Sequence, residues 1–249
     1  MYPSANLVAF VNVEDFRHAI LSILKEFKKQ DSTLKQPEAA TKYPLNSVYL
    51  AVSYDTDLIA FHNIIPYLDY FYDFFAAQPD LFVEIRTKSA NQTFYKNHNP
   101  LENIIFAFTL SPEKVVQKYE RCTPSLKLRI KAIQTAITEG FKVRLCFDPI
   151  FINDDIDALY EPFYNYIFNE LNLNKIVDVG YGFFRMPKEF YKRIQKRQEK
   201  QQSNSQLFCE EYCINEDVVS YSKDLQEKVQ EEHYKLLTKY IQKERIFSL

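Results

Sequence analysis

Glycine is scarce in this chain, where only Gly140, Gly180 and Gly182 occur among 249 residues. Loops that cradle phosphate groups need several glycines, because only then can backbone amides come close to the ligand. The composition therefore argues against a P-loop and against the G-x-G-x-x-G loop of dinucleotide-binding domains.

Cysteine is also sparse, with only four residues in the chain. So few cysteines argue against a disulfide framework and indicate a reducing, cytoplasmic setting. We interpret Cys122 and Cys146 as unpaired thiols, with Cys146 in the core. Cys209 and Cys213 lack a third ligand at metal-binding spacing, and the four histidines are scattered. The sequence thus predicts neither a metal site nor a Ser/His/Asp triad.

Long apolar runs and a surplus of one charge are missing as well. No window approaches the roughly 18 uncharged apolar residues of a membrane-spanning helix, and the first residues lack the basic start of a signal peptide. We therefore expect no membrane partner. With 31 basic and 33 acidic residues the net charge is −2, so no global positive field attracts nucleic acid.

One local basic cluster spans residues 188–200. It contains Lys188, Lys192, Arg193, Lys196, Arg197 and Lys200. Contact with the phosphates of DNA is one interpretation of this cluster. A solvated helix face is the other, because Glu189 and Glu199 dilute the positive charge.

The chain does have enough apolar residues for a full core, at 46% of the sequence. Apolar runs alternate with amphipathic segments, which favours α/β architecture with parallel strands and right-handed crossovers. The helices are expected after Asn12, at Leu58–Phe75, between Thr123 and Gly140, and at Asp157–Leu171. The strands are expected at Asn6–Val11, Ser47–Ser53, Leu81–Lys88, Glu102–Leu110, Lys142–Ile152 and Ile176–Arg185.

Local signals refine these boundaries. Asn12 with Asp15 predicts a capped start for the first helix, which should bury one apolar stripe. Pro66 should kink or restart the second helix. Thr123 is the expected N-cap of the third helix, and Gly140 its stop.

The last part of the chain differs in character. Gln195–Gln206 is polar and of low complexity, and we expect it to be irregular. Leu207–Tyr221 is predicted to form a hairpin, and Lys223–Gln242 a charged helix with a narrow apolar seam. We therefore divide the chain into a barrel-like unit, residues 1–200, and a C-terminal hairpin and helix extension, residues 201–249.

Three apolar runs each end on a polar residue, namely Lys88, Thr109 and Asp148. The carboxyl ends of parallel strands meet at one edge, which is where α/β barrels build their sites. Simpler interpretations remain open: a solvated lysine at a strand end, a threonine in a favoured strand position, and an aspartate that starts a turn. Residues 53–57 either cradle a ligand or cap the next helix through Thr56 or Asp57.

The order of several of these segments along the chain is informative. The chain contains NLVAFVNVEDF, EIRTKSAN, IIFAFTLSPEKVVQKYERCTPSLKLRIKAIQTAITEGFKV, FDPIFI and GFFRMPKEF. This ordered set resembles the spore photoproduct lyase family over most of the chain, from about Asn6 to Arg197. The resemblance implies a partial (β/α)6 barrel of the TIM type and a radical S-adenosylmethionine lyase that repairs thymine dimers in DNA.

The resemblance also implies site residues. In the family, a C-x-x-x-C-x-x-C motif holds a 4Fe–4S cluster to which S-adenosylmethionine binds. By position, Thr56, Lys88 and Thr109 match the family's polar cofactor contacts, and Asp148 lies at a fourth strand tip. Tyr2 matches the tyrosine that follows the last cluster cysteine.

The sequence departs from the family in three functional parts. It begins MYPSANL, where the family has just completed its cluster motif, so no cluster ligands are present. Tyr54 stands where the family has its hydrogen-donating cysteine, which is the catalytic position. The segment CINEDVVSYSKD carries Glu216 and Asp217, whereas the family's DNA-engaging hairpin is basic.

Two explanations compete for these departures. The abrupt start favours an N-terminally incomplete chain, and the alternative is a relative that has lost the chemistry. In both cases we expect no radical chemistry from this chain alone. Other functions stay open: a non-catalytic module that binds S-adenosyl compounds or nucleotides, or an interaction protein that uses the C-terminal helix.

Overall fold

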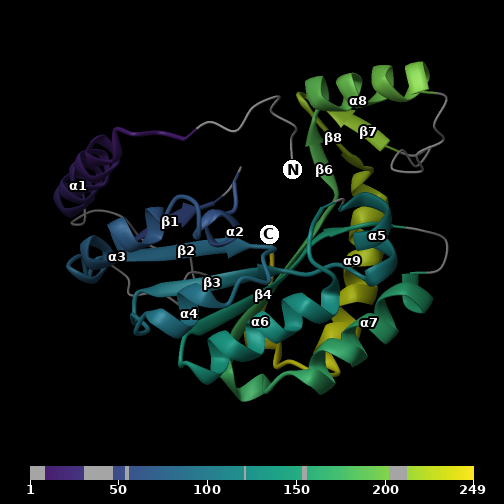
Figure 1. Ribbon diagram of the computed structural model, residues 1–249. Coiled ribbons are helices and arrows are strands. Elements are labelled where there is room, and N and C mark those ends of the chain that lie inside the picture. The colour runs from purple at the N-terminus through teal and green to yellow at the C-terminus, as the bar shows by residue number, and fades with distance from the viewer. Residues whose placement is uncertain (1–8, 31–46, 54–55, 121, 153–155, 202–211) are drawn as a thin grey trace.

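The computed structural model describes residues 9–30, 47–53, 56–120, 122–152, 156–201 and 212–249. Its main body is a six-stranded sheet in the order β1-β2-β3-β4-β5-β9, in which every neighbouring pair is parallel. The sheet curls into an open half-barrel with helices on its outer face (Figure 1). This architecture confirms the α/β partial barrel predicted from the sequence. The strands are β1 Val48–Val52, β2 Leu81–Thr87, β3 Ile104–Thr109, β4 Lys142–Ile150, β5 Ile176–Phe183 and β9 Ile246–Ser248.

Helices connect these strands, and a small second sheet follows β5. The longer helices are α1 Val13–Gln30, α3 Tyr67–Ala76, α6 Leu126–Thr138, α7 Ile156–Glu170, α8 Lys188–Gln201 and α9 Lys223–Thr238. The shorter ones are α2 Leu58–Phe61, α4 Thr93–Asn97 and α5 Glu113–Tyr119. The antiparallel sheet β6-β8-β7 consists of β6 Arg185–Pro187, β7 Tyr212–Asn215 and β8 Val218–Tyr221, and it lies beside α8 (Figure 1).

The alternation of residues along the strands decides which side chains form the core. In β2, Leu81, Val83 and Ile85 are buried in the hydrophobic core, and they point to the same side because side chains alternate along a strand. The intervening residues, Glu84 and Arg86, are charged and face the opposite, concave side. The half-barrel therefore has an apolar outer layer under the helices, and on its inner face the charged residues of β2 lie beside Ile105 and Ala107 of β3.

Several local predictions are confirmed. Pro66 ends the predicted long helix and starts a new one, since α2 ends before it and α3 begins at Tyr67. Gly140 ends α6 with a positive φ of 88°, a conformation that a residue with a side chain rarely adopts. The hairpin predicted near the C-terminus is present as β7 and β8.

The N-terminal region differs from the prediction. Asn6–Val11 was expected to be a strand, but its described residues, from Ala9 onwards, are irregular, with Phe10 and Val11 exposed. The Tyr67 hydroxyl donates to the Phe10 carbonyl over 2.6 Å, so residues 9–11 lie against α3 and do not pair in a sheet. The expected buried stripe of α1 is also wrong. Only Leu24 of that stripe is buried, because α1 lies at the side of the half-barrel and not over the sheet (Figure 1).

Three further elements differ. The N-cap of α6 is Ser125 and not Thr123, and its first amide is satisfied by Glu113, whose Oε2 accepts from Leu126 N over 2.9 Å. The segment from Gln195 to Gln201 is helical because α8 continues through it on strong helix formers; residues 202–206 lie outside the described part. Strand β1 is a continuous apolar run, which is typical of a strand covered on both faces, yet Tyr49 and Ala51 are exposed, because they lie on the open inner face in register with Phe82 and Glu84.

The C-terminal residues contain a strand that the sequence did not predict. Strand β9 pairs in parallel with β5, with Gly180 opposite Phe247. A Cβ atom on Gly180 would lie 2.8 Å from the Phe247 ring, so the close packing of these strands requires glycine there. The end of the chain thereby completes one side of the half-barrel.

Candidate functional site at the strand tips

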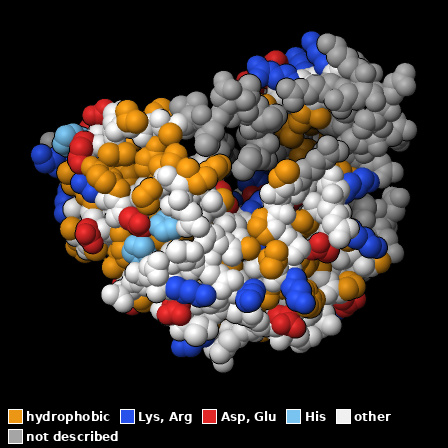
Figure 2. Space-filling view, in the orientation of Figure 1, with side chains coloured by type: hydrophobic (Ala, Val, Ile, Leu, Met, Phe, Trp, Pro, Cys, Tyr) orange, Lys and Arg blue, Asp and Glu red, His pale blue; other side chains and the backbone are white. Residues whose placement is uncertain are grey.

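Charged side chains line the inner face of the half-barrel. They come from alternate positions of three strands: Glu84 and Arg86 of β2, Arg144 of β4, and Asp178 of β5. Arg144 pairs with Asp178 in the strand register, so the two residues lie side by side. Figure 2 shows a hollow in the middle of this face of the molecule, with charged side chains inside it.

These residues form a continuous ladder of alternating charge. Arg144 makes a two-pronged contact with Asp178, at 2.6 Å from Nε to Oδ1 and 3.0 Å from Nη2 to Oδ2. Its Nη1 donates to Glu84 Oε2 over 2.5 Å. The Arg86 Nη2 lies 3.0 Å from Glu84 Oε1, and its Nη1 lies 3.3 Å from Asp148 Oδ2. The inner part of the ladder is nearly dry, because the Arg144, Glu84 and Asp178 side chains are at most 5% exposed.

Electrostatics keep the ladder charged. Burial alone would raise the pKa of Glu84, but Arg86, the Tyr49 hydroxyl and Arg144 outweigh it and hold that pKa below its usual value. Burial likewise opposes the charged form of Arg86, and the neighbouring carboxylates of Glu84 and Asp148 raise the pKa of Arg86 in compensation. Buried ion pairs are costly unless each charged group has a partner, and here each charged side chain of the ladder contacts at least one side chain of opposite charge.

Lys88, at the tip of β2, takes part in a second cluster. Its Nζ lies 2.5 Å from Glu120 Oε1, and the other oxygen of Glu120 lies 2.5 Å from Nη2 of the fully buried Arg129. Burial would raise the pKa of Glu120, but Lys88 and Arg129 together hold it below its usual value. Lys88 is therefore ion-paired and partly solvated, with its side chain 31% exposed.

Asp57 fixes the backbone around Lys88. Its carboxylate caps α2 by accepting from Ala60 N over 2.9 Å, and it also accepts from Thr87 Oγ1 at 2.8 Å and from Lys88 N at 2.7 Å. The capping interpretation of residues 53–57 is thus confirmed for Asp57. Thr56, the preceding residue, is exposed.

Asp148, at the tip of β4, is held between two arginines. Besides Arg86, it accepts from Arg185, whose Nη1 lies 3.1 Å from Oδ1 and whose Nη2 lies 3.4 Å from Oδ2. Gly182 leaves room for this pair, because a Cβ atom there would lie 3.0 Å from Arg185 Nη1 and 3.2 Å from Asp148 Oδ1. Since Arg185 belongs to β6, Asp148 also ties the small sheet to the half-barrel.

The structure brings together three of the six site residues predicted from the sequence. Thr87 pairs with Phe108 and Thr109 with Cys146, so the tips of β2, β3 and β4 are neighbours. Lys88, Thr109 and Asp148 therefore lie at one edge of the sheet, with Thr109 buried there. Tyr2 and Tyr54 lie outside the described residues.

Sequence reasoning missed the ladder and Glu120. A signal for the ladder was present, because FVEIRTK and KVRLCFD place charged residues at every second position inside apolar runs. A charge within a buried strand calls for a partner. No comparable signal marked Glu120, which reaches Lys88 only through the fold.

A cluster of iron and sulfur finds no suitable ligands in the described part of the chain. Such clusters are held by several cysteine thiolates. Cys122 and Cys213 are exposed, whereas Cys146 is buried on the sheet, and burial raises its pKa to about 12. Among the described residues, no group of three or more His, Cys, Asp or Glu side chains is arranged to hold a metal ion.

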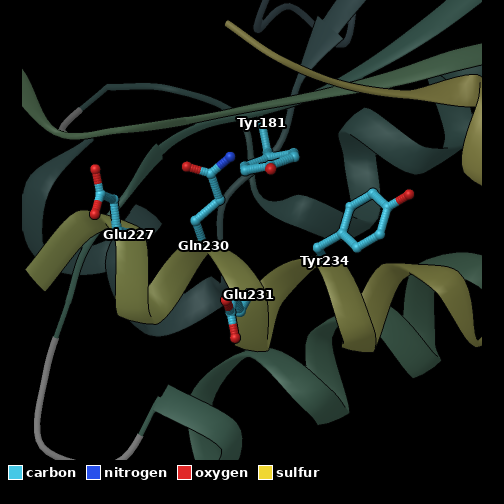
Figure 3. Close-up of a pocket in the computed structure, with 5 residues that line it drawn as sticks. All are labelled: Tyr181, Glu227, Gln230, Glu231 and Tyr234. Atoms are coloured by element: carbon cyan, nitrogen blue, oxygen red, sulfur yellow. The ribbon is translucent and has the colours of Figure 1, made fainter. Parts of the chain in front are cut away.

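A separate hollow of about 520 Å³ lies along α9 (Figure 3). It is lined by Tyr181 of β5 and by Glu227, Gln230, Glu231 and Tyr234 of α9. Tyr181 is on the helix-facing side of β5, opposite to Asp178, because the two are an odd number of residues apart. This hollow thus shares no residue with the strand-tip site.

No helix in the described part of the chain is long and apolar enough to cross a membrane.

The sequence matches no protein-family model and no curated protein. Solved structures, however, share its fold. Spore photoproduct lyase in complex with a dinucleoside spore photoproduct superposes with a TM-score of 0.75 at 14% identity, covering 96% of this chain and 67% of that chain. A variant with bound AdoMet and the same dinucleoside matches with a TM-score of 0.74, at the same identity and coverage. At this level of identity the likeness shows the fold, and it confirms the fold expected from the ordered motifs.

Proposed function

We propose that this chain binds an adenosyl ligand, S-adenosylmethionine or a related nucleoside, across the tips of β2, β3 and β4. The observation that carries the proposal is the meeting of Lys88, Thr109 and Asp148 at one edge of the half-barrel. The fold supports it, because a solved structure with this fold contains AdoMet. Sites of α/β barrels lie at this edge.

The chemistry of the three side chains suits the parts of such a ligand. A lysine ammonium has three N–H donors, so Lys88 can serve a ligand carboxylate while one N–H stays with Glu120. The Asp148 carboxylate can accept from ribose hydroxyls, as acidic residues do in dinucleotide-binding domains. The Thr109 hydroxyl supplies either a donor or an acceptor.

The lyase reaction of the family requires a cluster for which the described residues provide no ligands. We therefore propose binding, and we derive no radical step for this chain. In the alternative of an interaction protein that uses the C-terminal helix, the apolar seam of α9 is not available to a partner, because Val229, Leu236 and Leu237 pack in the chain's own core, and only the charged face of α9 is exposed.

A short stretch of DNA is a second candidate ligand. The solved relative contains a dinucleoside spore photoproduct, and α8 carries Lys188, Lys192, Arg193 and Lys196 beside the small sheet. Fluorescence anisotropy with a labelled thymidine dinucleotide tests this idea: binding that weakens with salt supports it, and no binding at low salt refutes it.

Isothermal titration calorimetry with S-adenosylmethionine tests the main proposal. We expect saturable binding to the full chain and a loss of about tenfold or more in affinity for Lys88→Ala, since a hydrogen bond to a charged group contributes about 1.5–3 kcal/mol. Lys142→Ala is the matched control, because Lys142 also pairs with a glutamate, Glu102, but at the opposite end of the sheet. Equal affinities for all three proteins, or no binding at all, would refute the proposed site.

A further inference from the structure

Glu120 receives three donors from three different parts of the strand-tip edge. Oε1 accepts from Lys88 Nζ at 2.5 Å and from Ser111 Oγ at 3.1 Å, and Oε2 accepts from Arg129 Nη2 at 2.5 Å. Lys88 follows β2, Ser111 follows β3, and Arg129 lies on α6. Glu120 itself directly follows α5, so it joins four segments at the mouth of the half-barrel.

Each of the three guanidinium nitrogens of Arg129 donates a hydrogen bond within the chain. Its Nε donates to the Pro124 carbonyl at 3.0 Å, its Nη1 to the Thr109 carbonyl at 3.2 Å, and its Nη2 to Thr123 Oγ1 at 2.7 Å as well as to Glu120. The side chain is about 1% exposed, so it cannot face a ligand. Its contribution is to anchor Glu120.

Lys88 is the member of the cluster that remains partly accessible. Its side chain is 31% exposed, whereas that of Glu120 is 8% exposed. A free lysine would spread over many rotamers, and fixing it on ligand binding would cost conformational entropy. Glu120 already holds the ammonium group in one place. Lys88 and Arg129 carry two positive charges, and Glu120 and the neighbouring Asp57 carry two negative ones, so Lys88 meets a ligand carboxylate as the accessible cation of the cluster and not through a net positive charge.

We propose that Glu120 is a positioning residue that sets Lys88 for the single carboxylate of the ligand, and so makes the site selective for adenosyl compounds that carry an amino-acid group. This inference rests on the proposed function. It adds a residue that binds no ligand itself and acts through Lys88, and it narrows the ligand class to monocarboxylates.

The test compares two adenosyl ligands, of which only one carries the amino-acid group. S-Adenosylmethionine has the carboxylate, whereas 5′-methylthioadenosine keeps the adenosine and the sulfur but has no amino-acid part. For Glu120→Gln we expect about a tenfold or greater loss of affinity for S-adenosylmethionine and less than about a twofold change for 5′-methylthioadenosine, since interactions with charged groups contribute more than neutral ones. If Glu120 had only a structural role, Glu120→Gln would lower the affinity for both ligands equally.

A double-mutant cycle shows whether Glu120 acts through Lys88. Once Lys88→Ala has been made, adding Glu120→Gln should change the affinity for S-adenosylmethionine by less than about twofold, because residues that act as a unit are not additive. Losses that multiply would overturn the inference. Glu120→Asp serves as the second variant if Glu120→Gln folds poorly, because it keeps a negative charge beside the buried Arg129.

A measurement without any ligand separates the two proposals. Acylation of individual lysines, followed by mass spectrometry, reports how firmly Lys88 is held. We expect Lys88 to react more slowly in the native protein than in Glu120→Gln, whereas Glu102→Gln should leave Lys88 unchanged and only alter Lys142, its partner at 2.7 Å.

The outcomes are distinct. If neither ligand binds the native protein but Lys88 is released in Glu120→Gln, the proposed function fails and the positioning contact stands. If S-adenosylmethionine binds but Glu120→Gln binds it equally well, the function stands and the positioning role fails.

Discussion

Replacing Arg144 by methionine should test whether the inner ladder is dry and charged. Arg144 contacts Asp178 at 2.6 and 3.0 Å and Glu84 at 2.5 Å, and its side chain is 4% exposed. Methionine fills much of the same space but carries no charge. After the change Glu84 still has Arg86, whereas Asp178 loses its two-pronged partner at a position that is 1% exposed.

The expected loss follows from this geometry. Removing one partner of a buried ion pair costs about 3–5 kcal/mol, because the other charge stays buried without compensation. That is a large share of the 5–15 kcal/mol that is typical for the stability of a folded protein. Adding Asp178→Asn to Arg144→Met should restore part of the loss, since the buried negative charge that Arg144 compensates is then absent.

Urea unfolding followed by far-ultraviolet circular dichroism measures these differences, and this probe is suitable because the chain has no tryptophan. Lys192→Met is the control: it removes an exposed pair with Glu189, at 50% and 74% exposure, and should cost less than about 1 kcal/mol. A loss for Arg144→Met as small as that of the control, or no recovery in the double variant, would contradict the reasoning.

Two further predictions concern buried titratable groups. Burial lowers the pKa of His233 from 6.5 to about 4, so between these values the unfolded chain takes up a proton that the folded chain does not. The free energy of unfolding should therefore fall as the pH drops from 6.5, by at most about 1.4 kcal/mol per pH unit. Urea unfolding at pH 6.5 and at pH 5 measures this pH dependence, and we expect it to be weaker in His233→Gln. The same pH dependence in both proteins would argue against a buried neutral imidazole. Cys146 is fully buried, and its pKa is raised to about 12. Iodoacetamide should therefore label Cys122 and Cys213 in the native protein and Cys146 only after unfolding, which mass spectrometry of the peptides measures. Labelling of native Cys146 at the rate of Cys122 would refute its burial.

Much of the fold could be read from the sequence because its signals are local. Apolar runs with period two or with little interruption marked β1 to β5, and Pro66 and Gly140 marked helix ends, since both act on the backbone of their own neighbourhood. Where a prediction depended on packing, it was less secure. The stripe on α1 is apolar, yet only Leu24 is buried, because the pattern does not say what the helix lies against.

The strand-tip site was predicted in part. Lys88, Thr109 and Asp148 could be grouped because the carboxyl ends of parallel strands share an edge. Their partners could not be inferred in this way. Glu120 lies 32 residues from Lys88 in the chain, and Arg185 lies 37 residues from Asp148. Nothing in the local pattern links such pairs.

The sequence by itself determined strands β1 to β5 and the longer helices between them, the apolar residues of the outer layer, and the three polar strand ends. Only the tertiary structure decided how the inner charges pair, which carboxylate holds Lys88, and that β9 joins the sheet next to β5. The physical reason is that register and curl set the distances between residues on different strands. A single-residue shift in register would turn Glu84 or Arg144 to the opposite face and leave its partner unpaired.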